Sequence, residues 1–294
     1  MHRRRLNISL LLVVVICQFF VAVVTSAATE NLKTAIARVT TAQADSFSQI
    51  AADITTLIPD PDSTVKAADA GDPELKKAFH YVHRIYTDHF SKTLPRISWT
   101  SENAFADEFF VEFFAPEDNQ PAHMEKLAKI ADRLKPHFSR KNLQEKPGVL
   151  SGGGIIGFAK GGEWVVLTDE IADWPTDQVA AIMAHEISHL QKRDFVKIML
   201  IRQLHGELVK LFPENSRAGY KKILDLFAAR WQRYSEYEAD AQAVQLMKKA
   251  GFDPAGMLQV LKRLADESES SANYLYREHP STAQRSAAVK RLLK

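Results

Sequence analysis

Residues 176–190 of the chain read TDQVAAIMAHEISHL, a mainly apolar stretch with a few polar residues at regular spacing. Val179, Ile182 and Leu190 fall at helical spacings with other apolar residues, and no Gly or Pro interrupts them. Pro175 and Thr176 suit the first turn of a helix, one as a pre-set first residue or the other as a cap. The stretch therefore predicts an α-helix.

Two histidines and a glutamate within this helix form the pattern H-E-x-x-H. His185 and His189 are four residues apart, so they project from the same face and are able to bind one Zn²⁺ ion. Glu186 is rotated by about 100° from His185, which lets its carboxylate reach a zinc-bound water rather than the metal. The pattern predicts His185 and His189 as zinc ligands and Glu186 as the general base of a zinc hydrolase.

A catalytic zinc needs a third protein ligand and an open position for water. Residues 234–241 supply a candidate, because Glu236 and Asp240 are again four apart on a second helical stretch. Glu238 is rotated by about 200° from Glu236 and points away. We expect Glu236 to ligate the zinc and Asp240 to accept the free ring N–H of a ligand histidine.

These motifs stand in the order H-E-x-x-H at 185–189, E-x-x-A-D at 236–240, and His279-Pro280-Ser281 with Arg285. In this order the chain closely resembles the CAAX-prenyl-protease and HtpX-like gluzincin metallopeptidases, and is most similar to their soluble periplasmic BepA-like and Oma-like branch. The resemblance covers roughly residues 72–294. It implies an α+β, mostly helical fold of zincin type, with a small sheet next to the H-E-x-x-H helix, one Zn²⁺ per chain and polypeptide substrates.

Two further residues of the last motif are candidates for the catalytic group, beside Glu186 and Asp240. His279 precedes a proline and either approaches the metal or the oxyanion, or is only a loop histidine beside a helix start. Arg285 lies one turn into the last helix and either orients a carboxylate or binds the substrate backbone. Both alternatives stay open for each residue.

The chain begins with a segment that resembles an export signal. Arg3, Arg4 and Arg5 precede nearly continuous apolar sequence over residues 6–24, followed by small residues. Residues 1–27 are therefore either a signal peptide cleaved after Ala27 or Ala28, or an uncleaved anchor whose residues 6–24 are the membrane contact. In both cases the catalytic part lies outside the cytoplasm and is periplasmic or secreted.

Charge and cysteine content exclude several classes of function. The net charge is +2, and residues 1–27 carry three arginines and no acidic residue, so without them it becomes +2 − 3 = −1. No nucleic-acid partner is expected from this balance. Cys17 is the sole cysteine, so a cleaved chain has neither a disulfide nor a cysteine nucleophile.

Residues 28–71 read as a helical extension and linker, and residues 72–294 as the zinc metallopeptidase domain. Apolar spacing predicts further helices from Pro73, over 122–138, 195–212, 218–231 and 254–264, and a last helix capped by Ser281. Aromatic-rich residues 97–114 favour strand. Residues 163–167 predict a strand whose exposed edge accepts an extended substrate chain.

The sequence thus predicts a zinc metalloendopeptidase that hydrolyses peptide bonds of exported or envelope proteins, misfolded ones in particular. One alternative is a zinc-binding, chaperone-like quality-control protein with a closed site. Another is a zinc hydrolase with a substrate other than peptides. The presence of Glu186 argues against a purely structural zinc, which needs no base.

Overall fold

A computed structural model describes residues 27–67, 73–113, 121–141, 143–150, 157–159, 162–267 and 280–294. The predictions for the first 26 residues, including Cys17, and for His279 lie outside these ranges. Within the described ranges no helix combines the length and apolar character that a membrane span requires.

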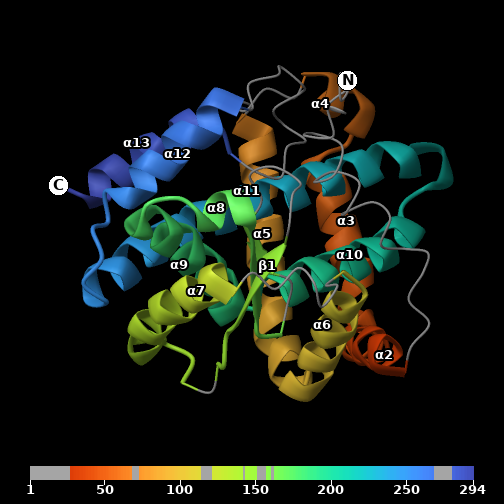
Figure 1. Cartoon of the computed structure of the whole chain (residues 1–294). Helices are drawn as coiled ribbons and strands as arrows, with labels where there is room; N and C mark the ends of the chain where they lie inside the picture. The colour runs from red at the N-terminus through yellow and green to blue at the C-terminus, as the bar shows by residue number, and fades with distance from the viewer. Residues whose placement is uncertain are drawn as a thin grey trace, which may run out of the picture.

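The chain forms an α+β fold that consists mostly of helices around one small sheet (Figure 1), which confirms the predicted fold class. The helices, in chain order, are α2 (Ala27–Thr41), α3 (Phe47–Leu57), α4 (Pro61–Ala67), α5 (Pro73–Thr93), α6 (Trp99–Phe113), α7 (Pro121–Leu134), α8 (Asp169–Ala172), α9 (Thr176–Lys192), α10 (Asp194–Leu211), α11 (Arg217–Lys249), α12 (Gly256–Glu267) and α13 (Thr282–Leu292). Ser281 caps α13 as predicted, its hydroxyl accepting a hydrogen bond from the Gln284 backbone N–H at 3.3 Å.

The sheet has three strands, β1 (Lys146–Leu150), β2 (Gly157–Ala159) and β3 (Trp164–Thr168), in the order β1-β3-β2. β1 runs parallel to β3, and β2 runs antiparallel to it. The strand predicted over residues 163–167 is therefore present as β3, but the prediction of its exposed edge is wrong because both its edges are paired. The outer strand on that side is β2.

β2 packs closely against helix α9. A Cβ atom placed on Gly157 would lie 2.7 Å from Ile182 Cγ2 and 2.9 Å from Leu167 Cδ2. Real Cβ atoms do not approach other atoms so closely, so only glycine lets the strand reach the helix at this point. The sheet is thereby held beside the turn of α9 that precedes His185.

Two sequence predictions about helices and strands differ from the structure. Residues 99–113 form α6 and not a strand, because Glu102, Phe105 and Ala106 fall at spacings of three and four and are buried together on one helical face. The aromatic residues favoured strand, but tertiary packing outweighs this propensity. Residues 218–231 and the Glu236 stretch form the single helix α11, since no Gly or Pro separates them.

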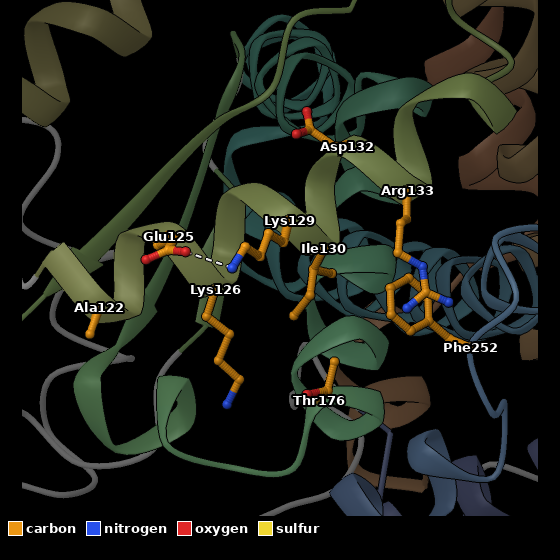
Figure 2. A pocket seen from close by; sticks show the side chains of 9 residues that line it. All are labelled: Ala122, Glu125, Lys126, Lys129, Ile130, Asp132, Arg133, Thr176 and Phe252. Carbon is orange, nitrogen blue, oxygen red and sulfur yellow. Dashed lines mark hydrogen bonds and ion pairs between the residues drawn. The ribbon is translucent and has the colours of Figure 1, made fainter.

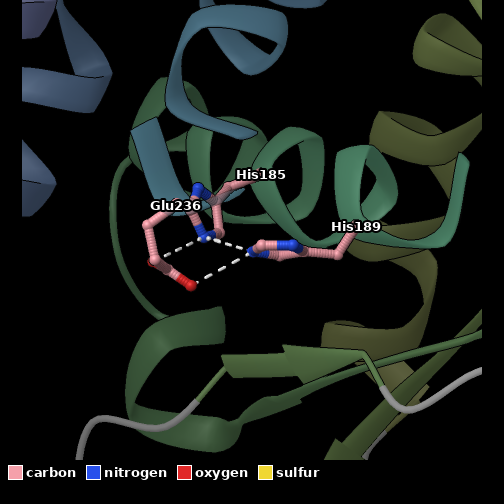
Figure 3. A group of neighbouring side chains, drawn as sticks. All are labelled: His185, His189 and Glu236. Atoms are coloured by element: carbon pink, nitrogen blue, oxygen red, sulfur yellow. Dashed lines mark hydrogen bonds and ion pairs between the residues drawn. The ribbon is translucent and has the colours of Figure 1, made fainter. Parts of the chain in front are cut away.

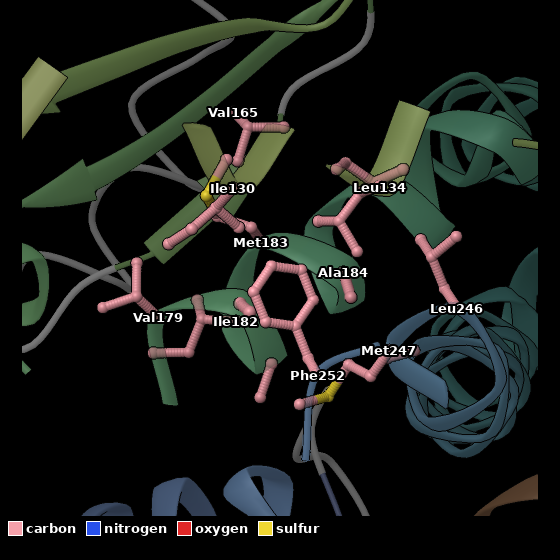
Figure 4. Close-up of a cluster of buried hydrophobic side chains, with 14 of the residues drawn as sticks. Ile130, Leu134, Val165, Val179, Ile182, Met183, Ala184, Leu246, Met247 and Phe252 are labelled. Atoms are coloured by element: carbon pink, nitrogen blue, oxygen red, sulfur yellow. The ribbon is translucent and has the colours of Figure 1, made fainter. Parts of the chain in front are cut away.

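The apolar side chains gather in two clusters, and α11 contributes to both. The first surrounds α9, which is buried along most of its length. Figure 4 shows part of this cluster, in which α9 meets α7, β3, the second half of α11 and the loop after it through Ile130, Leu134, Val165, Val179, Ile182, Met183, Ala184, Leu246, Met247 and Phe252.

The second cluster joins the N-terminal helices to the core of the protein. Helices α2, α3 and α5 pack with α10 and the first half of α11, through residues such as Leu32, Ile54, Tyr86, Leu204 and Phe227. The helices within the predicted 28–71 extension therefore share one core with helices of the predicted peptidase domain. The boundary at residue 72 stays a prediction.

The buried pair Tyr86–His205 in this second cluster makes stability depend on pH. Tyr86 Oη lies 2.5 Å from His205 Nε2, and burial lowers the pKa of His205 from 6.5 to about 3. Below pH 6.5 the unfolded chain takes up a proton that folded His205 does not. The free energy of unfolding then falls as the pH falls, by up to about 1.4 kcal/mol per pH unit from this group.

We expect His205→Gln, which keeps a hydrogen-bonding side chain beside Tyr86, to have a flatter dependence of stability on pH between 6.5 and 4. Urea unfolding across this pH range measures the slope. The matched control is His80→Gln, at an exposed position on α5, which should keep the wild-type slope. An unchanged slope in His205→Gln contradicts the assignment.

Candidate metal centre

Three side chains from two helices converge on one point (Figure 3). His185 Nε2 and His189 Nε2, both from α9, are 3.1 Å apart. The carboxylate of Glu236 on α11 places Oε2 at 3.5 Å from His185 Nε2 and Oε1 at 3.3 Å from His189 Nε2. The structure therefore brings together all three residues predicted as metal ligands.

The spacing of these atoms suits a zinc ion. Ligand atoms at about 2.0–2.2 Å from a tetrahedral metal are separated from one another by about 3.3–3.6 Å. The three observed separations of 3.1, 3.5 and 3.3 Å are close to this range. Two imidazoles and one carboxylate are also a common protein ligand set of catalytic zinc sites.

Each histidine of the cluster contacts a carboxylate through its other ring nitrogen. His185 Nδ1 lies 2.9 Å from Asp240 Oδ1, and His189 Nδ1 lies 2.9 Å from Asp194 Oδ2. When each Nδ1–H donates to its carboxylate, both Nε2 atoms direct their lone pairs at the shared point. Two facing lone pairs repel each other unless a positive charge lies between them, so the donor set fits a cation.

Asp194 was not among the predicted site residues. It follows His189 by five positions and begins α10, so no helical spacing connects the two residues. The contact depends on the tight turn between α9 and α10. A carboxylate shortly after the end of the metal helix was the only available signal in the sequence.

The electrostatics of the cluster also favour positive charge. Burial acts to lower the pKa of His189, but its hydrogen bonds with Asp194 and Glu236 and the negative charge of Glu186 raise it to about 10. Burial likewise opposes the charged form of His185, and contacts with Asp240 and Glu236 outweigh it, so that the pKa of His185 is also raised. A cation at this point receives the same stabilisation from the same carboxylates.

Arg285 from α13 also contacts the cluster. Its Nε and Nη2 donate to the two carboxylate oxygens of Asp240 at 2.8 and 2.7 Å, and its Nη1 lies 3.2 Å from Glu236 Oε2. Burial acts to raise the pKa of Asp240, but Arg285 and His185 lower it to about 2. Of the two alternatives for Arg285, the contacts match the one in which it orients a carboxylate.

The remaining predicted residues lie as follows. Glu186 is on α9 with only 9% of its surface exposed, and its charge acts on both His189 and Arg285. Glu238 is not part of the cluster and forms an ion pair with Lys192 at the end of α9. His83 on α5 packs edge-on against Tyr234, with ring centroids 5.5 Å apart, and is not part of the cluster.

A separate surface pocket lies on α7 beside the start of α9 (Figure 2). Its volume is about 690 Å³, and none of the cluster residues lines it. Lys126 in its wall donates to the carbonyls of Ala172 and Trp174, and Arg133 stacks on the ring of Phe252 at 3.6 Å. Lys126 thus holds α7 to the loop before α9, and Arg133 holds α7 to the end of α11 through the carbonyls of Ala250 and Gly251.

Comparison with known proteins identifies the family. The model of peptidase family M48 matches residues 121–293, which contain the metal cluster, Glu186 and Arg285. The chain belongs to peptidase family M48. It is therefore a metalloprotease, a hydrolase, and the resemblance expected from the three motifs is confirmed.

Curated relatives of this M48 peptidase are bacterial. The chain is similar to the beta-barrel assembly-enhancing protease of Escherichia coli strain K12, with 26% identity over 174 residues, which cover 54% of this chain and 36% of the relative. The protein of the same name from Yersinia pestis is 30% identical over 105 residues, which cover 31% of this chain and 22% of the relative. The match thus spans about a third or less of the length of these relatives.

The geometry predicts which acidic residue of α11 this M48 peptidase needs for metal. We expect Glu236→Ala to lose tightly bound metal because one of three converging ligand atoms is removed. Glu238→Ala, two residues away on the same helix, removes an equal carboxylate that is paired with Lys192 and should keep the metal. Elemental analysis after dialysis gives the metal content per chain. Metal loss in Glu238→Ala but not in Glu236→Ala contradicts the assignment.

A second prediction concerns the buried arginine. Arg285→Met keeps the length of the side chain but leaves Asp240 and Glu236 without a cation, and removing one partner of a buried ion pair costs about 3–5 kcal/mol. Chemical denaturation of the metal-free protein measures this loss. Arg291→Met, at an exposed position of the same helix, should change stability by less than about 0.5 kcal/mol. Equal stability of both variants contradicts the proposed burial cost.

Proposed function

We propose that the chain is a zinc-dependent metalloendopeptidase that hydrolyses peptide bonds of exported or envelope proteins, with one Zn²⁺ per chain. The observation that carries the proposal is the convergence of His185, His189 and Glu236, with Glu186 next to the first ligand on the same helix. A structural zinc site is closed by four protein ligands, whereas a catalytic site has three and an open position. The three ligand atoms found here fit the second kind.

The residues of the chain divide the chemistry between them. A bound zinc ion lowers the pKa of a coordinated water to about 7 and polarises the carbonyl of the scissile bond. Glu186 accepts the proton of the attacking water and later delivers it to the leaving amine. Burial of Glu186 to 9% exposure keeps bulk water from competing for this proton. No covalent intermediate with the protein is needed.

Three further residues keep the ligands in place. Asp240 and Asp194 fix the ring orientation of His185 and His189 and raise their basicity. Arg285 holds Asp240 through two hydrogen bonds and compensates the negative charge of the cluster. We assign these three residues positioning roles, while Glu186 is the catalytic base.

The proposed substrate class rests on the relatives that the chain resembles. The name of the relatives, beta-barrel assembly-enhancing protease, supports envelope proteins as the substrate class and export as the location.

A second candidate is a zinc-binding quality-control protein whose site is closed. The low exposure of His185 and Glu236, 8% and 6%, favours this alternative. Removal of zinc by a chelator distinguishes the two candidates. The peptidase loses hydrolysis of unfolded casein and recovers it with added zinc, whereas a closed-site protein shows no casein cleavage in either state.

We expect Glu186→Gln to keep its zinc and to lose casein hydrolysis by a factor of about 10²–10⁴, because the amide cannot accept the proton of water. The variant has the same size as wild type, so its metal content and its unfolding midpoint serve as internal controls. Gln178→Glu serves as a control, because it places a carboxylate at another buried position of α9. The double variant Glu186→Gln with Gln178→Glu should not regain casein cleavage. Wild-type rates in Glu186→Gln remove the base assignment.

A further inference from the structure

The turn between α9 and α10 has an unusual backbone conformation. Arg193 ends α9 with φ 57° and ψ 39°, and among the described residues it is the only non-glycine residue with positive φ. Glycine is the usual residue at such a helix end, and the left-handed conformation costs other residues about 1–2 kcal/mol. The side chain of Arg193 therefore has to contribute enough to offset this cost.

Three hydrogen bonds hold the Arg193 guanidinium. Its Nε donates to Glu102 Oε2 at 2.8 Å, its Nη1 to the carbonyl of Leu94 at 2.9 Å and its Nη2 to the carbonyl of Ile97 at 3.1 Å. Glu102 is 1% exposed. Burial raises the pKa of Glu102, and the Arg193 guanidinium offsets part of that effect. The end of α9 is thus tied to α6 and to the α5–α6 connection by a buried ion pair and two backbone contacts.

The next residue, Asp194, connects this turn to the metal cluster. Its Oδ2 contacts His189 Nδ1 at 2.9 Å, and its Oδ1 accepts from Lys197 Nζ at 3.1 Å. Since Asp194 is bonded directly to Arg193, the left-handed turn determines where its carboxylate lies. A change in this turn moves the group that orients a metal ligand.

The anchor comes from a part of the chain that the family match does not cover. Glu102 lies in α6, and the match to peptidase family M48 begins at residue 121. α6 packs against β3 and against the turn before it, where a Cβ added to Gly162 would lie 2.6 Å from Ala106 Cβ. α6 also packs against α2. The position of Glu102 is therefore set by the N-terminal helices on one side and by the sheet on the other.

We propose that Glu102 and Arg193 are positioning residues for the metal ligand His189, and that through them the N-terminal helical segment supports the metal centre. The inference rests on the proposed zinc-peptidase function. Glu102 holds Arg193 in the left-handed turn, the turn places Asp194, and Asp194 orients the imidazole of His189. Neither Glu102 nor Arg193 touches the metal ligands itself.

Zinc affinity of the purified full chain, measured by competition with a chromogenic chelator, tests the proposal. Arg193→Met is the decisive variant, because it removes the three hydrogen bonds of the anchor while the left-handed turn stays as strained for methionine as for arginine. Arg193→Gly adopts the turn without strain and should therefore retain more zinc affinity than Arg193→Met. Glu102→Gln removes the charge of the anchor and keeps its shape. Asp194→Asn removes the carboxylate that contacts His189. Loss of such a hydrogen-bond partner of a metal ligand lowers metal affinity by about 10–100-fold.

We expect Arg193→Met and Glu102→Gln each to lower zinc affinity by about threefold to tenfold, a smaller loss than that of Asp194→Asn. Adding Glu102→Gln to Asp194→Asn should cause little further loss, because both changes act on the same path. The visible absorption of the cobalt-substituted variants should also shift from that of wild type, since the orientation of His189 changes.

Lys126→Met is the matched control. Lys126 donates to the carbonyls of Ala172 and Trp174 before the other end of α9, so its loss releases a comparable loop without touching Asp194. Zinc affinity within about twofold of wild type in both Arg193→Met and Glu102→Gln overturns the proposal, as does an equal loss in Lys126→Met. A wild-type chain that binds no zinc overturns the proposed function instead.

Discussion

The contact between the Glu236 carboxylate on α11 and the two imidazoles on α9 is the constraint on which the rest of the structure depends. It joins residues about fifty positions apart and brings ligand atoms with facing lone pairs within 3.1–3.5 Å of one another. Such an arrangement is stable only where a cation compensates it and where the surrounding helices cannot move apart. The packing of α9 against α11 in the first apolar cluster prevents these helices from moving apart.

The polar groups around the cluster explain how charge is tolerated inside an otherwise apolar helix pair. Asp240 is 1% exposed, and Arg285 is 9% exposed. A buried carboxylate without a partner costs several kcal/mol, whereas a bidentate arginine satisfies both of its oxygens. Because Asp240 binds Arg285 and His185 together, α13 is connected to α9 through α11. The last helix is in this way part of the metal centre although it supplies no ligand.

The sequence predicted the parts of the site that depend on helical spacing. His185, Glu186 and His189 share one helix, and Glu236 and Asp240 share another, so i, i+4 spacing was sufficient to place them. Asp194 was missed because it is connected to His189 through a turn and not through helical spacing. The spacing of apolar residues also does not indicate that Arg193 adopts the left-handed conformation at the end of α9. The aromatic residues of α6 were wrongly predicted as a strand. β-propensity reports how well a residue suits a half-buried sheet surface, and it does not report which elements the segment packs against in the fold. The order of the strands was not predicted from the sequence either, because β3 lies between two strands that both precede it in the chain.

The length of α11 connects the two halves of the fold. Its first half packs with α5 and α10 in the second cluster, and its second half carries Glu236 and packs with α9 in the first. The N-terminal helices therefore reach the metal centre along two routes, one through α11 to Glu236 and one through Arg193 and Asp194 to His189. Since the two routes end on different residues of one cluster, the proposed support of the metal centre by the N-terminal helices acts on Glu236 as well as on His189.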